Sequence, residues 1–65
     1  MIKNNLAVLL AKKKMRISEL HRITGISAST LSNIYNEKTN MIGFDTIEKI
    51  CKELECEVGD LLYIE

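Results

Sequence analysis

The sequence predicts an all-α fold in which five short helices pack around one hydrophobic core. Apolar residues recur at spacings of three and four along several short stretches, which is the period of one helix face. The chain contains no Pro and three Gly, so few residues interrupt these stretches. With 65 residues it has room for one small domain, which we expect to span residues 1–65.

The first two helices are expected over residues 4–14 and 18–24. Lys12–Lys14 places positive charge at the C-terminal end of the first helix, where it suits the helix dipole. Gly25 follows the second helix and can supply the left-handed backbone conformation that ends it. The residues expected to face the core are Leu6, Leu9, Leu10, Leu20 and Ile23.

A third helix is expected over residues 28–36, and Ser27 is its predicted N-cap because a serine hydroxyl accepts a hydrogen bond from a free amide. Its apolar stripe consists of Leu31, Ile34 and Tyr35. The opposite face is small and polar and carries no charge before Glu37. Because an ordinary solvent-exposed helix is rich in Lys and Glu, this face favours contact with a hydrogen-bonding partner.

A polar loop over residues 37–43 is expected to lead into a fourth helix that runs to about Glu55. Asp45 and Glu48 have the spacing of a capping box, which predicts that Asp45 caps this helix. Val58–Asp60 is typical of a turn that feeds a fifth, very short helix. The residues of these elements expected to face inward are Ile47, Ile50, Cys51, Leu54, Leu61 and Leu62.

The net charge of zero conceals an uneven distribution. Residues 1–38 carry seven Lys and Arg against two Glu, for a net +5. Residues 39–65 carry two Lys against seven Asp and Glu, for a net −5. Such a chain can present a basic face to a polyanion while its acidic residues lie on the opposite side. Alternatively, the lysine run at residues 12–14 is only a solvated helix end.

Chemistry-bearing residues are few, and they predict neither an enzyme nor a metal site. Cys51 and Cys56, if both helical, would have Cα atoms roughly 8 Å apart, too far for a disulfide. Their spacing does not match the common zinc patterns, and His21 is the only imidazole. We therefore expect no cofactor. The longest apolar run, Leu6–Ala11, is too short to span a membrane, so we expect a cytoplasmic protein with two reduced thiols.

The central pattern of the sequence is the spacing of Leu20, Gly25, Leu31 and Ile34, which is typical of two short helices joined by a tight turn. Such a unit holds its second helix at a fixed angle, from which the helix can enter the major groove of DNA. By spacing alone, a helix corner in an ordinary bundle explains the pattern equally well. The uncharged polar face of the third helix favours the DNA-binding interpretation.

The stretch from Ile17 to Leu62 resembles the Cro and phage-repressor class of helix-turn-helix regulators. The motifs that carry the resemblance are GIS..TLS on the turn and third helix, FDT..KIC..L.C on the fourth helix and GDLL on the fifth. The resemblance implies a compact five-helix, lambda-repressor-like domain with its helix-turn-helix at helices 2 and 3. It also implies a transcriptional regulator, more often a repressor, that binds a two-fold symmetric operator as a homodimer without a cofactor.

The resemblance also assigns roles to residues of this sequence. Four residues at the start of the third helix and one turn along it would contact bases: Ser27, Ala28, Ser29 and Asn33. Residues around the motif and in the following loop would contact phosphates: Arg16, Ser18, Thr30, Ser32, Asn36, Lys38, Thr39, Asn40 and Phe44, the last through a backbone amide. The apolar end of the chain would form a dimer seam: Leu62, Tyr63 and Ile64.

Three positions depart from the family pattern. His21 replaces a small residue where the two motif helices approach, so its ring must tilt outward or widen the crossing. Ile17 replaces a common phosphate-binding Gln, whose contact would pass to Arg16 or Ser18. Leu10 and Tyr35 replace an Arg–Glu pair, and we expect them to pack on each other.

A second function remains open beside DNA binding. The zero net charge and the apolar end of the chain also fit a helical module that binds another protein, such as an antitoxin or antirepressor. Failure to bind any DNA at low salt would favour this alternative.

Overall fold

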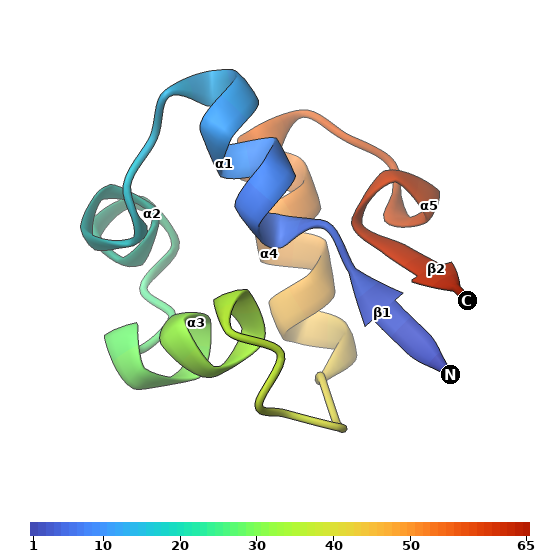
Figure 1. The fold of residues 1–65 in the computed structure, drawn as a ribbon. Coiled ribbons are helices and arrows are strands. Elements are labelled where there is room, and N and C mark those ends of the chain that lie inside the picture. The colour runs from blue at the N-terminus through green and yellow to red at the C-terminus, as the bar shows by residue number, and fades with distance from the viewer.

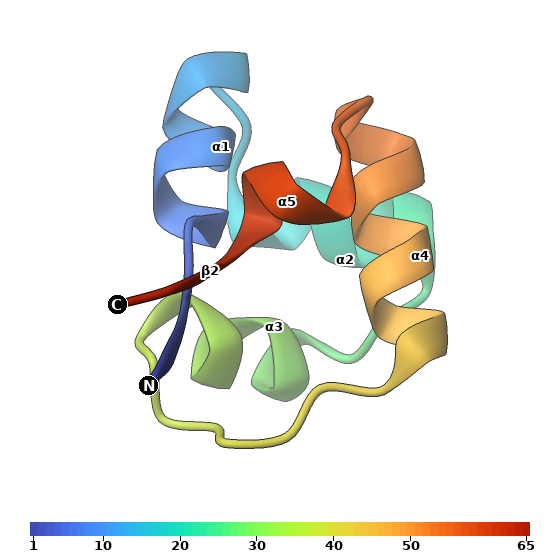
Figure 2. The ribbon, with the colours of Figure 1, turned by 90° about the vertical axis from the view of Figure 1, so that its right-hand side faces the viewer.

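The computed structural model describes residues 1–65. It contains the five expected helices and, at the two ends of the chain, two short strands (Figures 1 and 2). The elements, in chain order, are β1 (Ile2–Asn4), α1 (Leu6–Lys13), α2 (Ile17–Thr24), α3 (Ala28–Tyr35), α4 (Phe44–Leu54), α5 (Val58–Leu61) and β2 (Leu62–Ile64). In Figure 1, α2 and α3 lie on one side of the molecule, and α5 and the strands lie on the other. No helix has the length and apolar character that crossing a bilayer requires.

A single core of ten buried residues holds the helices together, and every helix contributes to it. All ten side chains are Leu, Ile or Cys: Leu6, Leu10, Leu20, Ile26, Leu31, Ile34, Ile50, Cys51, Leu54 and Leu61. Most residues expected to face inward are therefore buried. Leu9, Ile23, Ile47 and Leu62 are half-buried against the core, and Tyr35 is 40% exposed.

The two terminal strands are absent from the sequence prediction. β1 and β2 pair antiparallel, with Ile2 opposite Ile64 and Asn4 opposite Leu62. The first helix consequently starts at Leu6, and its expected start at Asn4 is wrong. The Asn4 side chain instead accepts a hydrogen bond from the Leu6 amide (3.1 Å) and donates one to the Ile34 carbonyl (3.0 Å). The strand thus fastens the start of α1 to the end of α3.

The predicted cap of the fourth helix is also wrong. Gly43 is the N-cap of α4 and no side chain caps its amides, while Asp45 lies inside the first turn. A capping box forms instead at α5, between Glu57 and Asp60, where the Glu57 amide donates to the Asp60 carboxylate (2.9 Å). The four-residue α5 is too short to be stable alone, so this box helps to fix it.

The end of α4 brings the two cysteines together. Glu55 adopts a left-handed conformation (φ 53°), and the Cys56 amide donates to the Cys51 carbonyl (2.9 Å). Cys56 therefore lies outside the helix, so the separation expected for two helical cysteines does not apply. In this type of helix end the two side chains face each other.

Candidate nucleic-acid interface

The α2–α3 unit is a stiff helix-turn-helix. Gly25 has φ +77°, as predicted, and its amide donates to the His21 carbonyl (2.9 Å). The Thr24 hydroxyl donates to the Leu20 carbonyl (2.6 Å) and accepts from the Ile26 amide (3.2 Å). Every residue of the turn is therefore held by hydrogen bonds or by core packing, which fixes the angle at which α3 leaves α2.

The His21 side chain points out of the α2–α3 unit. Its side chain is exposed, and Nδ1 lies 2.6 Å from the Ile26 carbonyl oxygen. Because a carbonyl only accepts, Nδ1 carries the proton and donates. The ring thus tilts outward, one of the two expected outcomes, and adds a further tie across the turn.

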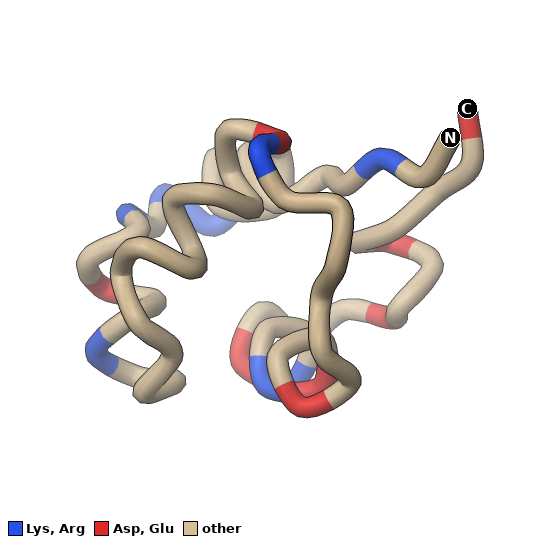
Figure 3. Tube along the Cα trace, turned by 90° about the horizontal axis from the view of Figure 1, so that it is seen from below, with Lys and Arg blue, Asp and Glu red and all other residues tan.

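The outer face of α3 is polar, uncharged and open to solvent. Ser29 and Asn33, one turn apart on this face, are both exposed, as are Ser27 and Ala28. Helix α3 contains no charged residue, whereas Lys, Arg, Asp and Glu occur on the elements around it (Figure 3). The face can thus offer hydroxyl and amide groups to a partner without bringing charge of its own.

Hydrogen bonds at the start of α3 divide its polar residues into two groups. Ser27 is the N-cap, as predicted: its hydroxyl accepts from the Thr30 amide (3.2 Å) and donates to the Thr30 hydroxyl (2.7 Å). Ser29 has only a long contact with Ser27 (3.4 Å), and the Asn33 amide is exposed. Ser29 and Asn33 are therefore the residues of this face most available to a partner.

The predicted phosphate-binding residues lie around α3 with different degrees of freedom. Asn36 donates to the Ser32 carbonyl (2.9 Å) at the end of the helix. The Thr39 hydroxyl is occupied by a local turn, since it donates to the Met41 carbonyl (2.8 Å). Lys38 and Asn40 are exposed in the loop that follows α3.

The N-termini of α2 and α4 supply further hydrogen-bond donors. Neither helix has a side-chain cap; its N-cap is Arg16 in α2 and Gly43 in α4. In α2 the Glu19 amide donates to the Arg16 carbonyl (3.1 Å). The earlier amides of the two helices remain available to an anion, in keeping with the expected roles of Ser18 and Phe44. The bare N-terminus of α4 could not be found from the sequence, because Asp45 indicated a capped helix.

Two other sequence predictions concern residues outside this face. The expected dimer residues Leu62, Tyr63 and Ile64 form β2, where Tyr63 is 41% and Ile64 83% exposed. Leu10 and Tyr35 line one hollow beside α1, but their direct packing stays a prediction.

The cysteines form no part of the interface. Cys51 is buried and Cys56 half-buried, and both are free thiols. Burial, together with the neighbouring Cys51 thiol and the carboxylates of Asp60 and Glu57, raises the pKa of Cys56 to about 11. The Cys56 thiol therefore stays protonated at neutral pH and is a poor nucleophile.

Comparison with known proteins identifies the family. The family model that describes a Cro/C1-type helix-turn-helix DNA-binding domain matches residues 5–65. This chain belongs to that family. Its members are helix-turn-helix DNA-binding transcriptional regulators, so the class and fold expected from the sequence are confirmed.

Two similar proteins agree with this assignment. The uncharacterized HTH-type transcriptional regulator YozG of Bacillus subtilis (strain 168) is 47% identical over 58 residues, which are 89% of this chain and 69% of YozG. The crystal structure of a Bacteroides fragilis protein, whose description gives DNA binding as a proposed role, superposes with a TM-score of 0.85 at 25% identity. That match covers 97% of this Cro/C1-type chain and 100% of the other.

Proposed function

We propose that this Cro/C1-type domain binds double-stranded DNA sequence-specifically by inserting α3 into the major groove. The observation that supports this most is the exposed, uncharged polar face of α3 on a rigid turn. The major groove presents a distinct pattern of donors and acceptors for each base pair, and short amide and hydroxyl side chains match that pattern. A helix whose angle is fixed by its predecessor can be aimed at such edges without further ordering.

Four residues of this region would read the bases. The Asn33 amide can pair with adenine through two hydrogen bonds, and the Ala28 methyl can touch the thymine methyl group. Ser29 can donate to or accept from several bases. Ser27 would contribute less, because its hydroxyl already donates to Thr30 (2.7 Å).

Phosphate contacts would hold the domain in register. Around α3 these would come from Thr30, Ser32, Asn36, Lys38, Thr39 and Asn40, and from the starts of α2 and α4 with Arg16, Ser18 and Phe44. Few of these residues are cationic, so we expect a modest salt dependence, equivalent to neutralising ~4–6 phosphates. Backbone and hydroxyl donors would supply most of the remaining contacts.

The active species would be a homodimer on a two-fold symmetric operator. Two copies of α3 would then enter successive major grooves about one helical turn apart. Leu62, Tyr63 and Ile64 of β2 would belong to the seam between the copies. A dimer bound in this way would act as a repressor by covering the DNA it occupies.

Fluorescence anisotropy tests the DNA-binding proposal. The chain should bind labelled genomic and random duplexes at low salt, and log Kd should change linearly with log salt concentration. The alternative is a helical module that binds another protein, for which the exposed Ile64 (83%) is the supporting observation. Low salt, about 20 mM, leaves electrostatic attraction to DNA largely unscreened. Absence of binding to every duplex under this condition would favour that alternative.

A further inference from the structure

Seven apolar residues gather around two adjoining hollows and the paired strands β1 and β2. Four of these residues are largely exposed: Ile2 (70%), Phe44 (91%), Val58 (53%) and Ile64 (83%). Three half-buried residues lie between them: Ile42, Ile47 and Leu62. We call these seven residues the α4–β2 face.

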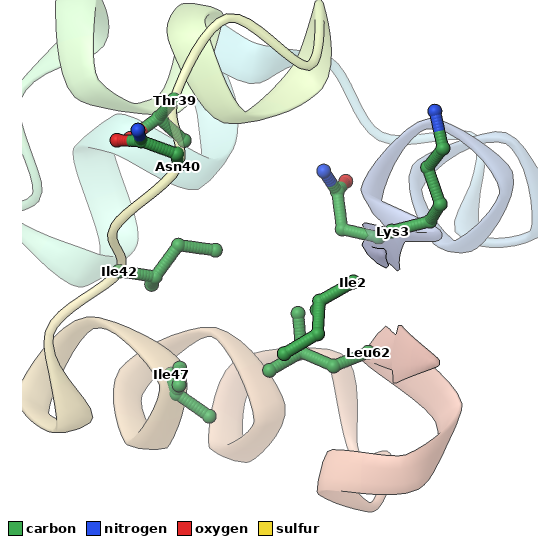
Figure 4. Close-up of a pocket in the computed structure, with 8 residues that line it drawn as sticks. Ile2, Lys3, Thr39, Asn40, Ile42, Ile47 and Leu62 are labelled. Carbon is green, nitrogen blue, oxygen red and sulfur yellow. The ribbon is translucent and has the colours of Figure 1, made fainter. Parts of the chain in front are cut away.

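The α4–β2 face contains both a hollow and a projecting ring. The hollow, of about 180 Å³, lies between β1, β2, α4 and the loop before α4 (Figure 4). Ile2, Ile42, Ile47 and Leu62 supply the apolar half of its lining, and Figure 4 shows Ile42 extending from the loop opposite Ile2 and Leu62. The other half is polar and consists of Lys3, Asn4, Thr39 and Asn40. The side chain of Phe44, at the start of α4, is 91% exposed. An enclosed apolar cavity of about 150 Å³ accepts a benzene ring. This hollow is open on one side and has a similar volume, so its size is compatible with a phenyl group.

The hollow and the ring are neighbours but do not coincide. Phe44 borders a second hollow, together with Val58 and others, and the two hollows share Ile47 and Leu62. A ridge of these two residues thus separates Phe44 from the first hollow. A two-fold axis through the ridge would bring each phenyl ring opposite the hollow of the other copy.

We infer that a second copy of this chain covers the α4–β2 face, with Phe44 of each subunit inserted into the Ile2–Ile42–Ile47–Leu62 hollow of its partner. The inference rests on the homodimer of the proposed function and specifies its contact. It extends the predicted seam of β2 to α4 and β1. The phenyl ring of Phe44 would bind the partner while its backbone amide stays available to a phosphate.

The exposed area matches what such a dimer requires. The four exposed side chains present roughly 600 Å² of apolar surface, taking about 150–250 Å² for a fully exposed Phe and somewhat less for Ile and Val. A standard interface buries about 800 Å² on each partner, of which about 65% is apolar in homodimers. One copy therefore supplies the apolar area that one side of a small two-fold interface needs.

The position of this face also suits a DNA-binding dimer. None of the seven residues belongs to α3, and one of them, Ile42, lines a hollow together with Asn33. In the proposed dimer the exposed Ser29 and Asn33 would point to DNA beside the covered face. A two-fold interface is self-complementary, and it closes without leaving an apolar patch that could recruit further copies.

An isotope-filtered NMR experiment tests the contact directly. The chain contains one Phe, so its ring signals belong to Phe44 without ambiguity. In a mixture of ¹³C-labelled and unlabelled chains, we expect intermolecular NOEs from the ring protons to the methyl groups of Ile42 and Leu62. A monomer at millimolar concentration, or a dimer without these NOEs, would overturn the inference.

Variants separate this inference from DNA binding itself. In sedimentation equilibrium without DNA, Phe44→Ala should weaken the dimer by about 30-fold or more, as expected for a central aromatic anchor. Val8→Ala, which shortens a half-exposed apolar residue on α1 outside the face, should leave the dimer constant unchanged. An undiminished dimer in Phe44→Ala would contradict the inference.

A third variant distinguishes failure of the proposed dimer contact from failure of the proposed DNA binding. Ile2→Glu places a carboxylate at the edge of the hollow, at a position that contacts no DNA in the proposed mode. We expect it to be monomeric and to bind a single half-site as tightly as the unaltered chain. A dimeric Ile2→Glu would contradict the proposed contact, whereas a dimeric wild-type chain that binds no DNA would contradict only the proposed function.

Discussion

The outer face of α3 and the α4–β2 face lie on one small core, yet their chemistry is opposite. The α3 face exposes Ser29 and Asn33 on a helix without charge, whereas the other exposes Phe44 and Ile64. A base edge rewards hydrogen bonds at fixed positions, and a protein partner rewards buried apolar area. The difference agrees with the two proposed partners, DNA at the α3 face and a second copy of the chain at the α4–β2 face. Variants that affect one face, the other or both can therefore separate the two roles.

The largest effect on stability is expected from a core residue, because both faces are carried by the same core. Leu31 is fully buried, so Leu31→Ala should lower the free energy of unfolding by about 2–5 kcal/mol. That is much of the stability of so small a domain. Urea unfolding followed by circular dichroism measures it. Val8→Ala, at a half-exposed site, should change stability by about 0.5 kcal/mol or less, and an equal loss in both variants would contradict the single shared core.

Next in size is the loss of a base-reading group. Asn33→Ala should weaken binding to the preferred operator by about 1–3 kcal/mol and relax the base preference at one position of each half-site. Asn40→Ala makes the same change in the exposed loop and should weaken all duplexes evenly. Anisotropy with operator and point-changed duplexes measures both, and an Asn33→Ala protein with unchanged preference would exclude base reading by this residue.

The rigidity of the turn can be tested at Gly25. Gly25→Ala should destabilise the domain by about 1–2 kcal/mol, because φ is +77° and an added Cβ meets no atom within 4 Å, so only backbone strain acts. Gly59→Ala is the matched control, since its Cβ also meets no atom and its φ is not positive. In the short α5 this change should be neutral or stabilising by about 1 kcal/mol or less. Equal effects in urea unfolding would contradict the strain argument.

A smaller effect is expected from the cationic loop residue. Lys38→Ala should weaken binding to all duplexes alike and reduce the slope of log Kd against log salt by about 0.9, the value for one phosphate. Lys52→Ala, on the acidic half of the chain, should leave the slope unchanged. Salt titrations of both proteins make the comparison, and a loss of slope in Lys52→Ala would move the DNA surface to α4.

The smallest effect concerns Cys56, which is not one of the seven residues of the α4–β2 face but lines the hollow beside Phe44. Its pKa is raised from 9.0 to about 11 in the folded protein, so the unfolded chain releases this proton first as the pH rises. Stability from this group is complete below pH 9 and declines between pH 9 and about pH 11. Unfolding measurements across this window should show a shallower decline in Cys56→Ser, and identical curves would rule out the contribution.

The parts of the fold that could be predicted from sequence are governed by local chemistry. The helical spacing of Leu20 and Leu31 predicts that they are core residues. The backbone freedom of Gly25 predicts the turn, and the hydroxyl of Ser27 predicts the helix cap. Each of these signals lies within a few residues of the feature it determines. The exposed polar residues of α3 could also be proposed, because charge is missing where a solvated helix would carry it.

The parts that could not be predicted depend on contacts between distant segments. Ile2 and Ile64 pair across nearly the whole chain, in strands of three residues that are too short to show an alternating pattern. The prediction of Asp45 as the N-cap of α4 is wrong. The helix begins earlier, because the Gly43 carbonyl already accepts the first helical hydrogen bond, from the Ile47 amide. The hollow lined by Ile2 and Ile42 forms between β1 and the loop before α4, which are far apart in sequence, so no local pattern could reveal it.

Selection of bound duplexes from a random pool tests the central claim most directly. We predict an enriched palindrome whose half-sites lie about one helical turn apart. When the selection is repeated with Asn33→Ala, one position of each half-site should lose its base preference. Enrichment of no sequence, or of the same sequence with equal strength by Asn33→Ala, would contradict the claim that α3 reads bases in the major groove.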